Sequence, residues 1–259
     1  MIVNHNGRFI DIDSPIITGR DGAWLFGDTL FETMKARQHT IHFAGQHLDR
    51  LASSARLLDL PIDREAIGAA LSESVRQTDA PLSRIRLTVS RGPFSGLVFP
   101  PSEHAHFLIE VGPYPGPEEN ELRNGIDVVI APNQRVNPLS HLPQMKRGNY
   151  ADCLYAANHA RKHGAREALF VDDNHRLLEG ATSNIFLVRV LALAAEWGLI
   201  TEERDVLFDD IFSADEVFIC NSLIDILPVA SCEGRALNQG ELGHRFLSAL
   251  REETDAISA

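Results

Sequence analysis

The sequence predicts a mixed α/β protein of the α+β kind with two domains, and three observations support this prediction. The chain has 259 residues, enough for one large or two modest domains. Strand and helix patterns are mixed along the chain and do not alternate regularly. Residues 112–124 hold three prolines, two glycines and a charge run, which is typical of a linker. We therefore expect a smaller α/β domain over residues 1–115 and a larger domain over residues 116–259 that carries Lys146.

The composition excludes several classes of protein. Hydrophobic residues make up 44% and charged residues 23%, as in ordinary globular chains. A net charge of −12 argues against binding to nucleic acid or to an anionic membrane. No apolar run approaches about 20 residues, and the N-terminus lacks the apolar segment of a signal peptide. The three cysteines are an odd number without metal spacing, so we expect free thiols in the cytoplasm and no metal site.

The first domain begins with a hairpin signal, Asn6-Gly7 between two short apolar runs in residues 1–10. Apolar residues recur at helical spacing over 44–58, which predicts an amphipathic helix that ends before Pro61. Asp63 can cap a second helix that runs to about Gln77. The other expected elements of this domain are strand formers mixed with glycines at 23–37, a strand at 83–91, a loop at 92–102 and a strand at 104–111.

Residues 83–91 alternate strictly, with Ile85, Leu87 and Val89 on one face and polar residues such as Arg86 on the other. This pattern predicts a strand with one apolar and one strongly polar face. In the second domain we expect strands at 126–131, 167–171, 184–189 and 216–220, and helices at 147–163 and from about 240.

Lysine is rare in this chain. Lys35, Lys146 and Lys162 are the three lysines, so chemistry that needs an amine has few candidates. Tyr150 follows Lys146 by one helical turn, which places a phenol and an amine on one face. A lone lysine at the start of a helix is usually only solvated, but an amine desolvated beside other cations readily forms a Schiff base.

Three further stretches carry polar side chains that suit a bound anion. Glu179 leads into a Gly-Ala-Thr-Ser-Asn turn whose N–H groups and hydroxyls, including Ser183 and Asn184, could face a ligand. Arg50 lies beside the apolar stripe of a predicted helix, and its planar guanidinium suits a phosphate. Residues 219–229 place a Cys-Asn-Ser run where a strand ends. Taken singly, these stretches also fit an ordinary turn or a surface arginine.

Together the motifs resemble the fold type IV pyridoxal-phosphate enzymes, the class IV aminotransferase family. This family includes branched-chain and D-amino-acid aminotransferases and aminodeoxychorismate lyase. The similarity runs from GDTLFET at 27–33 to NSLIDILPV at 221–229, nearly the whole chain. The motifs follow the family's order: Gly-Asp-x-x-Phe-Glu, His-x-x-Arg-Leu, a lysine followed by Asn-Tyr, Glu-Gly-x-x-Ser-Asn-Ile-Phe, and a late Pro-Val. Each motif is weak alone, and their shared order makes the resemblance specific.

The resemblance implies pyridoxal 5'-phosphate as cofactor and a role for each matching residue. Lys146 is then the Schiff-base lysine that shuttles protons at the substrate carbon, and Glu179 pairs with the pyridine nitrogen. Arg50 holds the phosphate, and Tyr150 bonds the 3-oxygen of the ring. Further cofactor contacts are implied at Ser183, Asn184, Asn221 and Ser222, and substrate contacts at Phe31, Arg86 and Leu223. Members of this family are usually homodimers, so a homodimer is implied here too.

The chain departs from the family pattern at one place. After Arg189 it passes directly into Val190 and an apolar run that reads as the middle of a helix. The family usually has a further strand, a loop and a phosphate-binding turn there. Either this protein has lost that turn, or a segment is missing from the sequence. The absence of a start signal for the following helix favours a missing segment.

The motifs separate the family's two chemistries only partly. The Cys-Asn-Ser at 220–222 and the RVNPLSHLPQMK that leads to the lysine resemble the lyase. Phe31 in place of a tyrosine, and no Arg-x-His pair after Arg91, argue against a usual D-amino-acid site. Arg86 suits a substrate carboxylate in either enzyme, although a surface strand arginine is an equal interpretation.

We predict from these motifs a 4-amino-4-deoxychorismate lyase that releases pyruvate and p-aminobenzoate on the folate route. The alternative is an aminotransferase of branched-chain or D-amino acids. A second alternative is a non-catalytic relative, which the four intact residues Lys146, Glu179, Arg50 and Tyr150 disfavour.

Overall fold

The computed structural model describes residues 1–135, 145–184, 197–199 and 204–258, and it separates into two compact units. The first unit comprises Met1–Pro115, Leu139–Asn149 and Ile257–Ala259, and the second comprises Gly116–Pro138 and Tyr150–Ala256. The chain leaves the first unit inside the predicted linker. Residues 145–149, which carry Lys146, return to the first unit.

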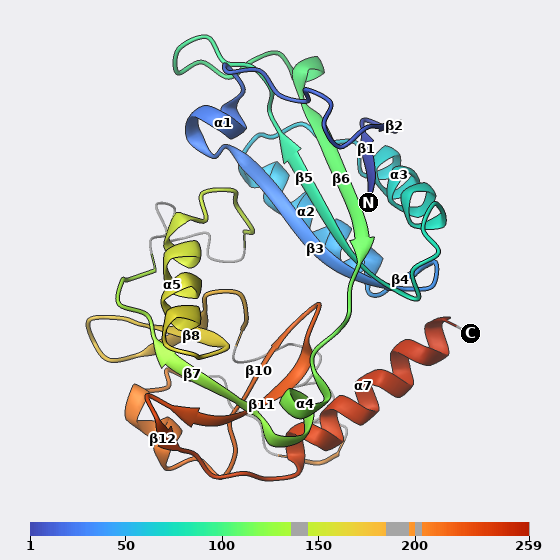
Figure 1. The fold of residues 1–259 in the computed structure, drawn as a ribbon. Coiled ribbons are helices and arrows are strands. Elements are labelled where there is room, and N and C mark those ends of the chain that lie inside the picture. Colours follow the sequence, from blue (N-terminus) through green and yellow to red (C-terminus); the bar gives the residue numbers. More distant parts are fainter. Residues whose placement is uncertain (136–144, 185–196, 200–203, 259) are drawn as a thin grey trace. The chain divides into compact units, whose positions relative to one another are not determined.

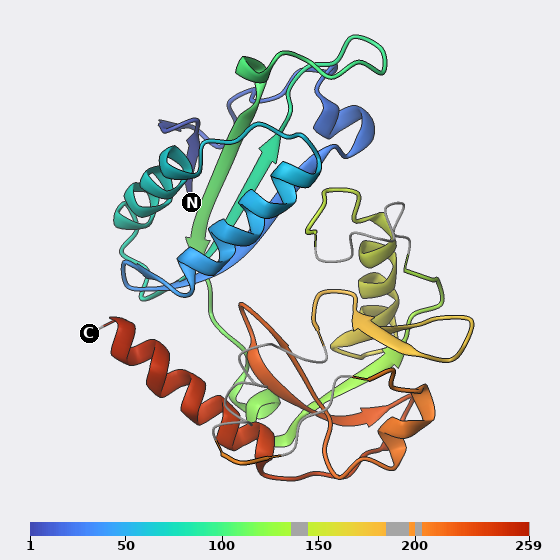
Figure 2. The same ribbon diagram turned by 180° about the vertical axis from the view of Figure 1, so that it is seen from behind.

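The first unit is an antiparallel six-stranded sheet in the order β2-β1-β6-β5-β3-β4, with α2 and α3 on one face (Figure 1 and, from behind, Figure 2). Its strands are β1 Ile2–His5, β2 Arg8–Ile10, β3 Thr29–Arg37, β4 Thr40–Ile41, β5 Leu82–Ser90 and β6 His106–Pro113. Its helices are α1 Gly22–Phe26, α2 Ala44–Leu57 and α3 Arg64–Arg76, with a short 3₁₀ turn at Ser102–His104.

The alternation predicted for residues 83–91 is confirmed in β5. Ile85, Leu87 and Val89 are buried in a core that also holds residues of α2 and α3. Strand β3 pairs with β5 in continuous antiparallel register from Thr29↔Ser90 to Arg37↔Leu82. Because side chains alternate along a strand, each residue of β3 faces either this core or the opposite side of the sheet.

Local capping chemistry explains where the first unit's helices begin. Asp63 caps α3 by accepting hydrogen bonds from the backbone N–H groups of Glu65 and Ala66, as the sequence predicts. Residues 23–37 are not strand throughout, because Asp21 caps the short helix α1 and accepts a bond from Ala23 N–H. Gly27 then ends this helix in the left-handed conformation at a φ of 64°, and β3 follows.

The second unit is built on a mixed sheet in the order β10-β11-β7-β8-β9, with β12 paired to β11 (Figure 1). Strand β7 runs parallel to both β11 and β8, and the other pairs are antiparallel. The strands are β7 Ile126–Ile130, β8 Glu167–Val171, β9 Leu177–Gly180, β10 Phe218–Asn221, β11 Asp225–Cys232 and β12 Arg235–Ala236. The helices are α4 Glu119–Asn124, α5 Ala151–Lys162 and α7 Leu242–Ser258, with a 3₁₀ turn at Phe208–Phe212.

Several elements of the second unit differ from the sequence predictions, because β9, β11, β12 and α4 were not expected and α5 begins later than predicted. Helix α5 begins at Ala151, not at 147, because residues 146–148 bond to the edge of β3 instead. Strand β11 was not expected, because Pro228 discourages a strand assignment. The ladder with β7 begins one residue later, at Val229↔Ile126, so the missing N–H of Pro228 interrupts no bond of that ladder. The predicted strand 184–189 and the junction at Arg189 and Val190 lie almost wholly outside the described residues.

No helix in the part of the chain that the structure describes is long and apolar enough to cross a membrane.

Candidate active site

In the first unit, one face of the sheet collects an aromatic ring and a guanidinium. Leu30 and Met34 of β3 belong to the core under the helices, so Phe31 and Thr33 face the other side. Arg86 of β5 lies directly opposite Thr33 in the ladder. Its guanidinium carbon stacks 3.5 Å from the centroid of the Phe31 ring, which is a cation–π contact. The predicted substrate residues Phe31 and Arg86 therefore lie together.

Lys146 joins this face through backbone pairing at the edge of β3. The N–H of Phe31 donates to the Lys146 carbonyl at 2.9 Å, and the N–H of Gly148 donates to the Thr29 carbonyl at 2.9 Å. A glycine is required at 148, because a Cβ there would lie 1.8 Å from Thr29 Oγ1. The Lys146 amine lies 5.7 Å from the Phe31 ring centroid. The structure thus brings Lys146, Phe31 and Arg86 to one face.

Arg50 contacts the helix-covered side of the same strand. Its Nε donates to Glu32 Oε1 at 2.7 Å, its Nη2 donates to Glu32 Oε2, and His47 Nδ1 lies 2.7 Å from that second oxygen. Burial raises the pKa of Glu32, but the hydrogen bonds from His47 and Arg50 outweigh it and hold that pKa below its usual value. Arg50 therefore commits two donors to Glu32, while its side chain is still 37% exposed.

In the second unit, Glu179 and Tyr150 share an arginine that the motifs did not single out. Arg135 Nε donates to Glu179 Oε1 at 2.8 Å, and Arg135 Nη1 donates to Asp152 Oδ2 at 2.6 Å. The guanidinium carbon lies 5.5 Å from the centroid of the Tyr150 ring. Burial is the largest effect that raises the pKa of Tyr150, and the nearby Cys153 raises it further. The phenol is therefore protonated at neutral pH and can donate a hydrogen bond.

The turn after β9 is closed around a buried glutamate. Glu167 Oε2 accepts hydrogen bonds from Thr182 Oγ1 at 2.6 Å, Ser183 Oγ at 3.0 Å and Thr182 N–H at 3.1 Å. A Cβ on Gly180 would lie 2.3 Å from Ser183 Oγ, so this position needs a glycine. The hydroxyl of Ser183 is thus directed at Glu167, and it would have to leave or share that bond to contact a cofactor.

The end of β10 lies beside the same turn. Asn184 and Cys220 exchange two backbone hydrogen bonds of 2.9 Å. The Asn221 amide donates to the Thr182 carbonyl at 3.1 Å, and its oxygen accepts from the N–H groups of Leu223 and Ile224. The side chain of Asn221 therefore builds the turn on which Ser222 and Leu223 lie. Within the second unit, the structure brings residues 182–184 and 220–223 together.

Sequence reasoning missed several partners of the predicted residues. His47 precedes Arg50 by three residues in a predicted helix, so their shared face could have been noticed. Arg135 and Glu179 are 44 positions apart, and Glu167 and Ser183 are 16 apart, with no motif to link them. Only the folded chain shows that these charges and hydroxyls meet.

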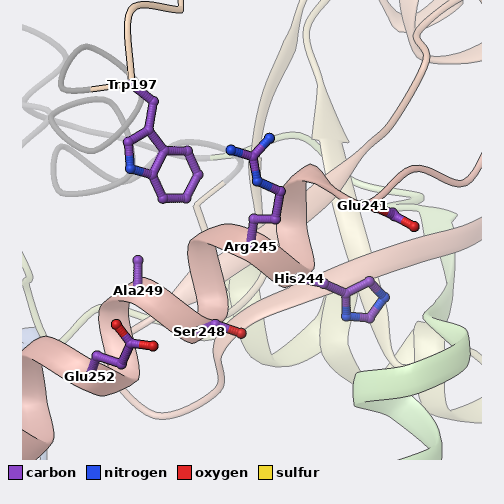
Figure 3. A pocket seen from close by; sticks show the side chains of 7 residues that line it. All are labelled: Trp197, Glu241, His244, Arg245, Ser248, Ala249 and Glu252. Carbon is purple, nitrogen blue, oxygen red and sulfur yellow. The ribbon is translucent and has the colours of Figure 1, made fainter.

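The described residues also line a pocket of about 480 Å³ beside α7 (Figure 3). The Trp197 ring stacks on Phe246 with centroids 5.0 Å apart, and the Arg245 guanidinium carbon lies 4.7 Å from the centroid of that indole. None of the predicted cofactor or substrate residues lines this pocket.

Comparison with known proteins identifies the relatives of this chain. The model of the family described as "Amino-transferase class IV" matches residues 29–189 and 188–232. These two segments meet at the junction of Arg189 and Val190, where the sequence departs from the family pattern. The chain is 29% identical to a putative branched-chain-amino-acid aminotransferase of Methanocaldococcus jannaschii, over 92% of this chain and 90% of the relative.

Two solved structures resemble the fold closely. The branched-chain aminotransferase of Escherichia coli superposes with a TM-score of 0.88 at 22% identity, covering 97% of this chain and 93% of that one. The 4-amino-4-deoxychorismate lyase of Pseudomonas aeruginosa gives a TM-score of 0.83 at 25% identity, covering 98% and 99%. The predicted mixed α/β fold of the fold type IV enzymes is confirmed.

Because Glu32 is buried and ion-paired, we expect its contribution to the stability of the folded chain to depend on pH. Its pKa in the folded chain is depressed, so its stabilising effect is complete above its usual pKa and is lost as the pH falls through the folded value. We expect Glu32→Gln to lower the free energy of unfolding by about 1–3 kcal/mol at pH 7. The deficit should shrink below about pH 4.5, as measured by urea unfolding across pH 3–7.

The matched control is Glu73→Gln, which removes an exposed carboxylate that is paired with Arg76. It should change stability far less at every pH. An equal loss for the two variants, or a Glu32→Gln deficit that grows as the solution is acidified, would contradict this assignment.

Proposed function

The chain belongs to the class IV aminotransferase family, and from this premise we propose that it is an aminotransferase that holds its amino-acid substrate by the carboxylate. It is a fold type IV enzyme that depends on pyridoxal phosphate, as its family does. The observation that carries the proposal is the shared face of Lys146, Phe31 and Arg86 in the first unit.

The residues present fit this cofactor by their chemistry. Lys146 supplies an amine for its aldehyde, and Tyr150 supplies a protonated phenol for the oxygen of its ring. Glu179 Oε2 has no hydrogen-bond partner among the described residues and would accept a bond from the ring nitrogen. Bound pyridoxal phosphate supplies an electron sink for the substrate's α-carbon. Lys146 Nζ would then move the proton at that carbon.

Binding of the phosphate is proposed at Arg50 with help from hydroxyl and amide groups. Arg50 donates to Glu32 through Nε and Nη2, and Nη1 has no hydrogen-bond partner among the described residues, so Nη1 can donate to an anion. In the second unit, Ser183, Asn184, Asn221 and Ser222 are the proposed further contacts. Because Asn221 and Ser183 are already bonded within their turn, we expect backbone N–H groups there to contribute as well.

Arg86 is the proposed anchor of the substrate carboxylate. A guanidinium binds a carboxylate through two parallel hydrogen bonds, and stacking on Phe31 fixes the plane of that fork. Phe31 leaves an apolar surface beside it. This pairing suits an amino acid with an apolar side chain, which agrees with the substrate class in the name of the Methanocaldococcus jannaschii relative. Leu223 is a further proposed apolar contact.

The second candidate function is the 4-amino-4-deoxychorismate lyase. The lyase from Pseudomonas aeruginosa aligns over 98% of this chain, and the Cys-Asn-Ser at 220–222 supports the same interpretation. Asn221, however, serves to build its turn, so this motif distinguishes the two reactions weakly. Arg86 would serve a dicarboxylate substrate equally well. We rank the aminotransferase first.

A product assay tests the proposal. The purified enzyme, loaded with pyridoxal phosphate, is incubated with 2-oxoglutarate and with L- or D-enantiomers of leucine, isoleucine, valine and alanine, and glutamate is measured. A parallel reaction contains aminodeoxychorismate, and pyruvate and p-aminobenzoate are measured. Glutamate formation from an apolar amino acid supports the aminotransferase. Pyruvate and p-aminobenzoate without glutamate would establish the lyase instead, and neither product would refute both.

Arg86→Gln gives a sharper prediction for the proposed carboxylate anchor. We expect kcat/KM for the preferred amino acid to fall about 100-fold, because a charge-assisted pair of hydrogen bonds is lost. The absorbance of the bound cofactor should stay unchanged. The control is Arg84→Gln, an exposed arginine two residues earlier on the same strand face, which should retain kcat/KM within about twofold. Equal losses in both variants would argue against a specific anchor.

We also propose a homodimer, supported by an exposed apolar patch of the first unit. The Phe26 and Phe94 rings lie 5.3 Å apart, which joins α1 to the loop after β5. Large exposed apolar surfaces of this kind mark protein interfaces. The exposed residues of this patch are Trp24, Leu25, Phe26, Leu97, Val98 and Phe99.

Sedimentation velocity tests the dimer. The wild-type chain should sediment as a dimer, and Trp24→Glu should shift it toward the monomer. Leu57→Glu changes another exposed apolar residue, which lies on α2 and outside the patch, and should leave the dimer intact. A monomeric wild type at micromolar concentration would refute the proposal.

A cytoplasmic location is proposed on the state of the cysteines. Cys153, Cys220 and Cys232 are buried free thiols, and burial raises the pKa of the Cys220 thiol to about 12. Such unreactive thiols persist in a reducing compartment. Cell fractionation with an antibody checks this, and recovery from a secreted fraction would contradict it.

A further inference from the structure

Arg135 joins two elements of the second unit from the loop just beyond β7. Its side chain is 22% exposed. Nε contacts Glu179 on β9 at 2.8 Å, and Nη1 contacts Asp152 in the first turn of α5 at 2.6 Å. A guanidinium is planar and its donors have fixed directions, so two simultaneous bonds fix the two carboxylates relative to each other.

The bond to Glu179 selects one orientation of a partly exposed side chain. The Glu179 side chain is 38% exposed, and an untethered glutamate at such a position samples several rotamers. Arg135 holds Oε1 and leaves Oε2 without a hydrogen-bond partner among the described residues. One carboxylate oxygen is thereby fixed while the other is presented to a ligand.

The bond to Asp152 fixes the start of α5, which lies next to Tyr150 in the chain. Tyr150 is the residue immediately before α5, and Asp152 is in the first turn of that helix. Arg135 therefore anchors the start of α5, and its guanidinium carbon also lies 5.5 Å from the Tyr150 ring centroid. Arg135 therefore contacts both the Glu179 carboxylate and the start of the helix that follows Tyr150, and these two groups come from different parts of the chain.

We propose that Arg135 is a positioning residue that fixes the Glu179 carboxylate and the Tyr150 phenol in the geometry that binds the pyridoxal ring. This inference rests on the proposed function. Arg135 itself touches neither the substrate nor the cofactor in this proposal, and it acts through Glu179 and Asp152.

The alternative is that Arg135 is only a structural ion pair, and the second unit contains a matched control for that case. Arg176 is likewise held between two carboxylates, with Asp172 at 2.7 Å and Asp205 at 3.2 Å. Among the described residues its ion pairs are to Asp172 and Asp205, and neither Glu179 nor Tyr150 is a partner. A purely structural role predicts that loss of either arginine has the same kind of effect, on stability alone.

The test compares Arg135→Gln, Arg135→Lys and Arg176→Gln with the wild-type chain. Each apo-protein is titrated with pyridoxal phosphate, and its absorbance is recorded against pH once it is loaded. We expect Arg135→Gln to weaken cofactor affinity by at least about tenfold and to shift the pH profile of the bound chromophore. Arg135→Lys keeps the charge without the fork and should recover only part of the affinity. Arg176→Gln should match the wild type in both measurements.

A double-mutant cycle tests whether Arg135 acts through Glu179. In a Glu179→Gln background, Arg135→Gln should cost much less affinity than it does alone. Full additivity, unchanged affinity and pH profile in Arg135→Gln, or an equal loss in Arg176→Gln would each overturn the inference. A wild-type chain that binds no pyridoxal phosphate would instead refute the proposed function, so the two failures are distinguishable.

Discussion

Two backbone hydrogen bonds at the edge of β3 determine which side chains lie next to Lys146. They attach residues 146–148 to Thr29 and Phe31, and they place the lysine on the face of the sheet that carries Phe31 and Arg86. Because a strand turns successive side chains to opposite faces, a shift by one residue would point the lysine toward the core instead. The close approach also explains why residue 148 is a glycine, since a Cβ there would collide with Thr29.

Each unit secures a carboxylate with an arginine, with different consequences. In the first unit, Glu32 is buried and uses both oxygens on Arg50 and His47, so the group stabilises the fold and positions Arg50. In the second unit, Glu179 is partly exposed and bonds to Arg135 through one oxygen. The first arrangement satisfies a buried charge, as buried charges require. The second leaves hydrogen-bonding capacity at a surface, as a ligand site requires.

Local patterns predicted much of the fold and less of the site. The alternation in β5 and the Asp63 cap were readable because both depend on neighbours within a few residues. The scarcity of lysine, with the order of the motifs, directed attention to Lys146. The parallel pairing of β11 with β7 and the bond from Arg135 to Glu179 depend on contacts between distant segments, which no local periodicity encodes. Pro228 further concealed β11, because proline is rare in central strands.

The central claim is that Lys146 carries the cofactor, and chemical reduction tests it most directly. The enzyme loaded with pyridoxal phosphate is treated with borohydride, which makes the bond to the lysine permanent, and its peptides are mapped by mass spectrometry. With three lysines in the chain, the assignment is unambiguous. The account predicts the modification on the peptide that contains Lys146. Modification at Lys35 or Lys162, or none at all, would contradict it.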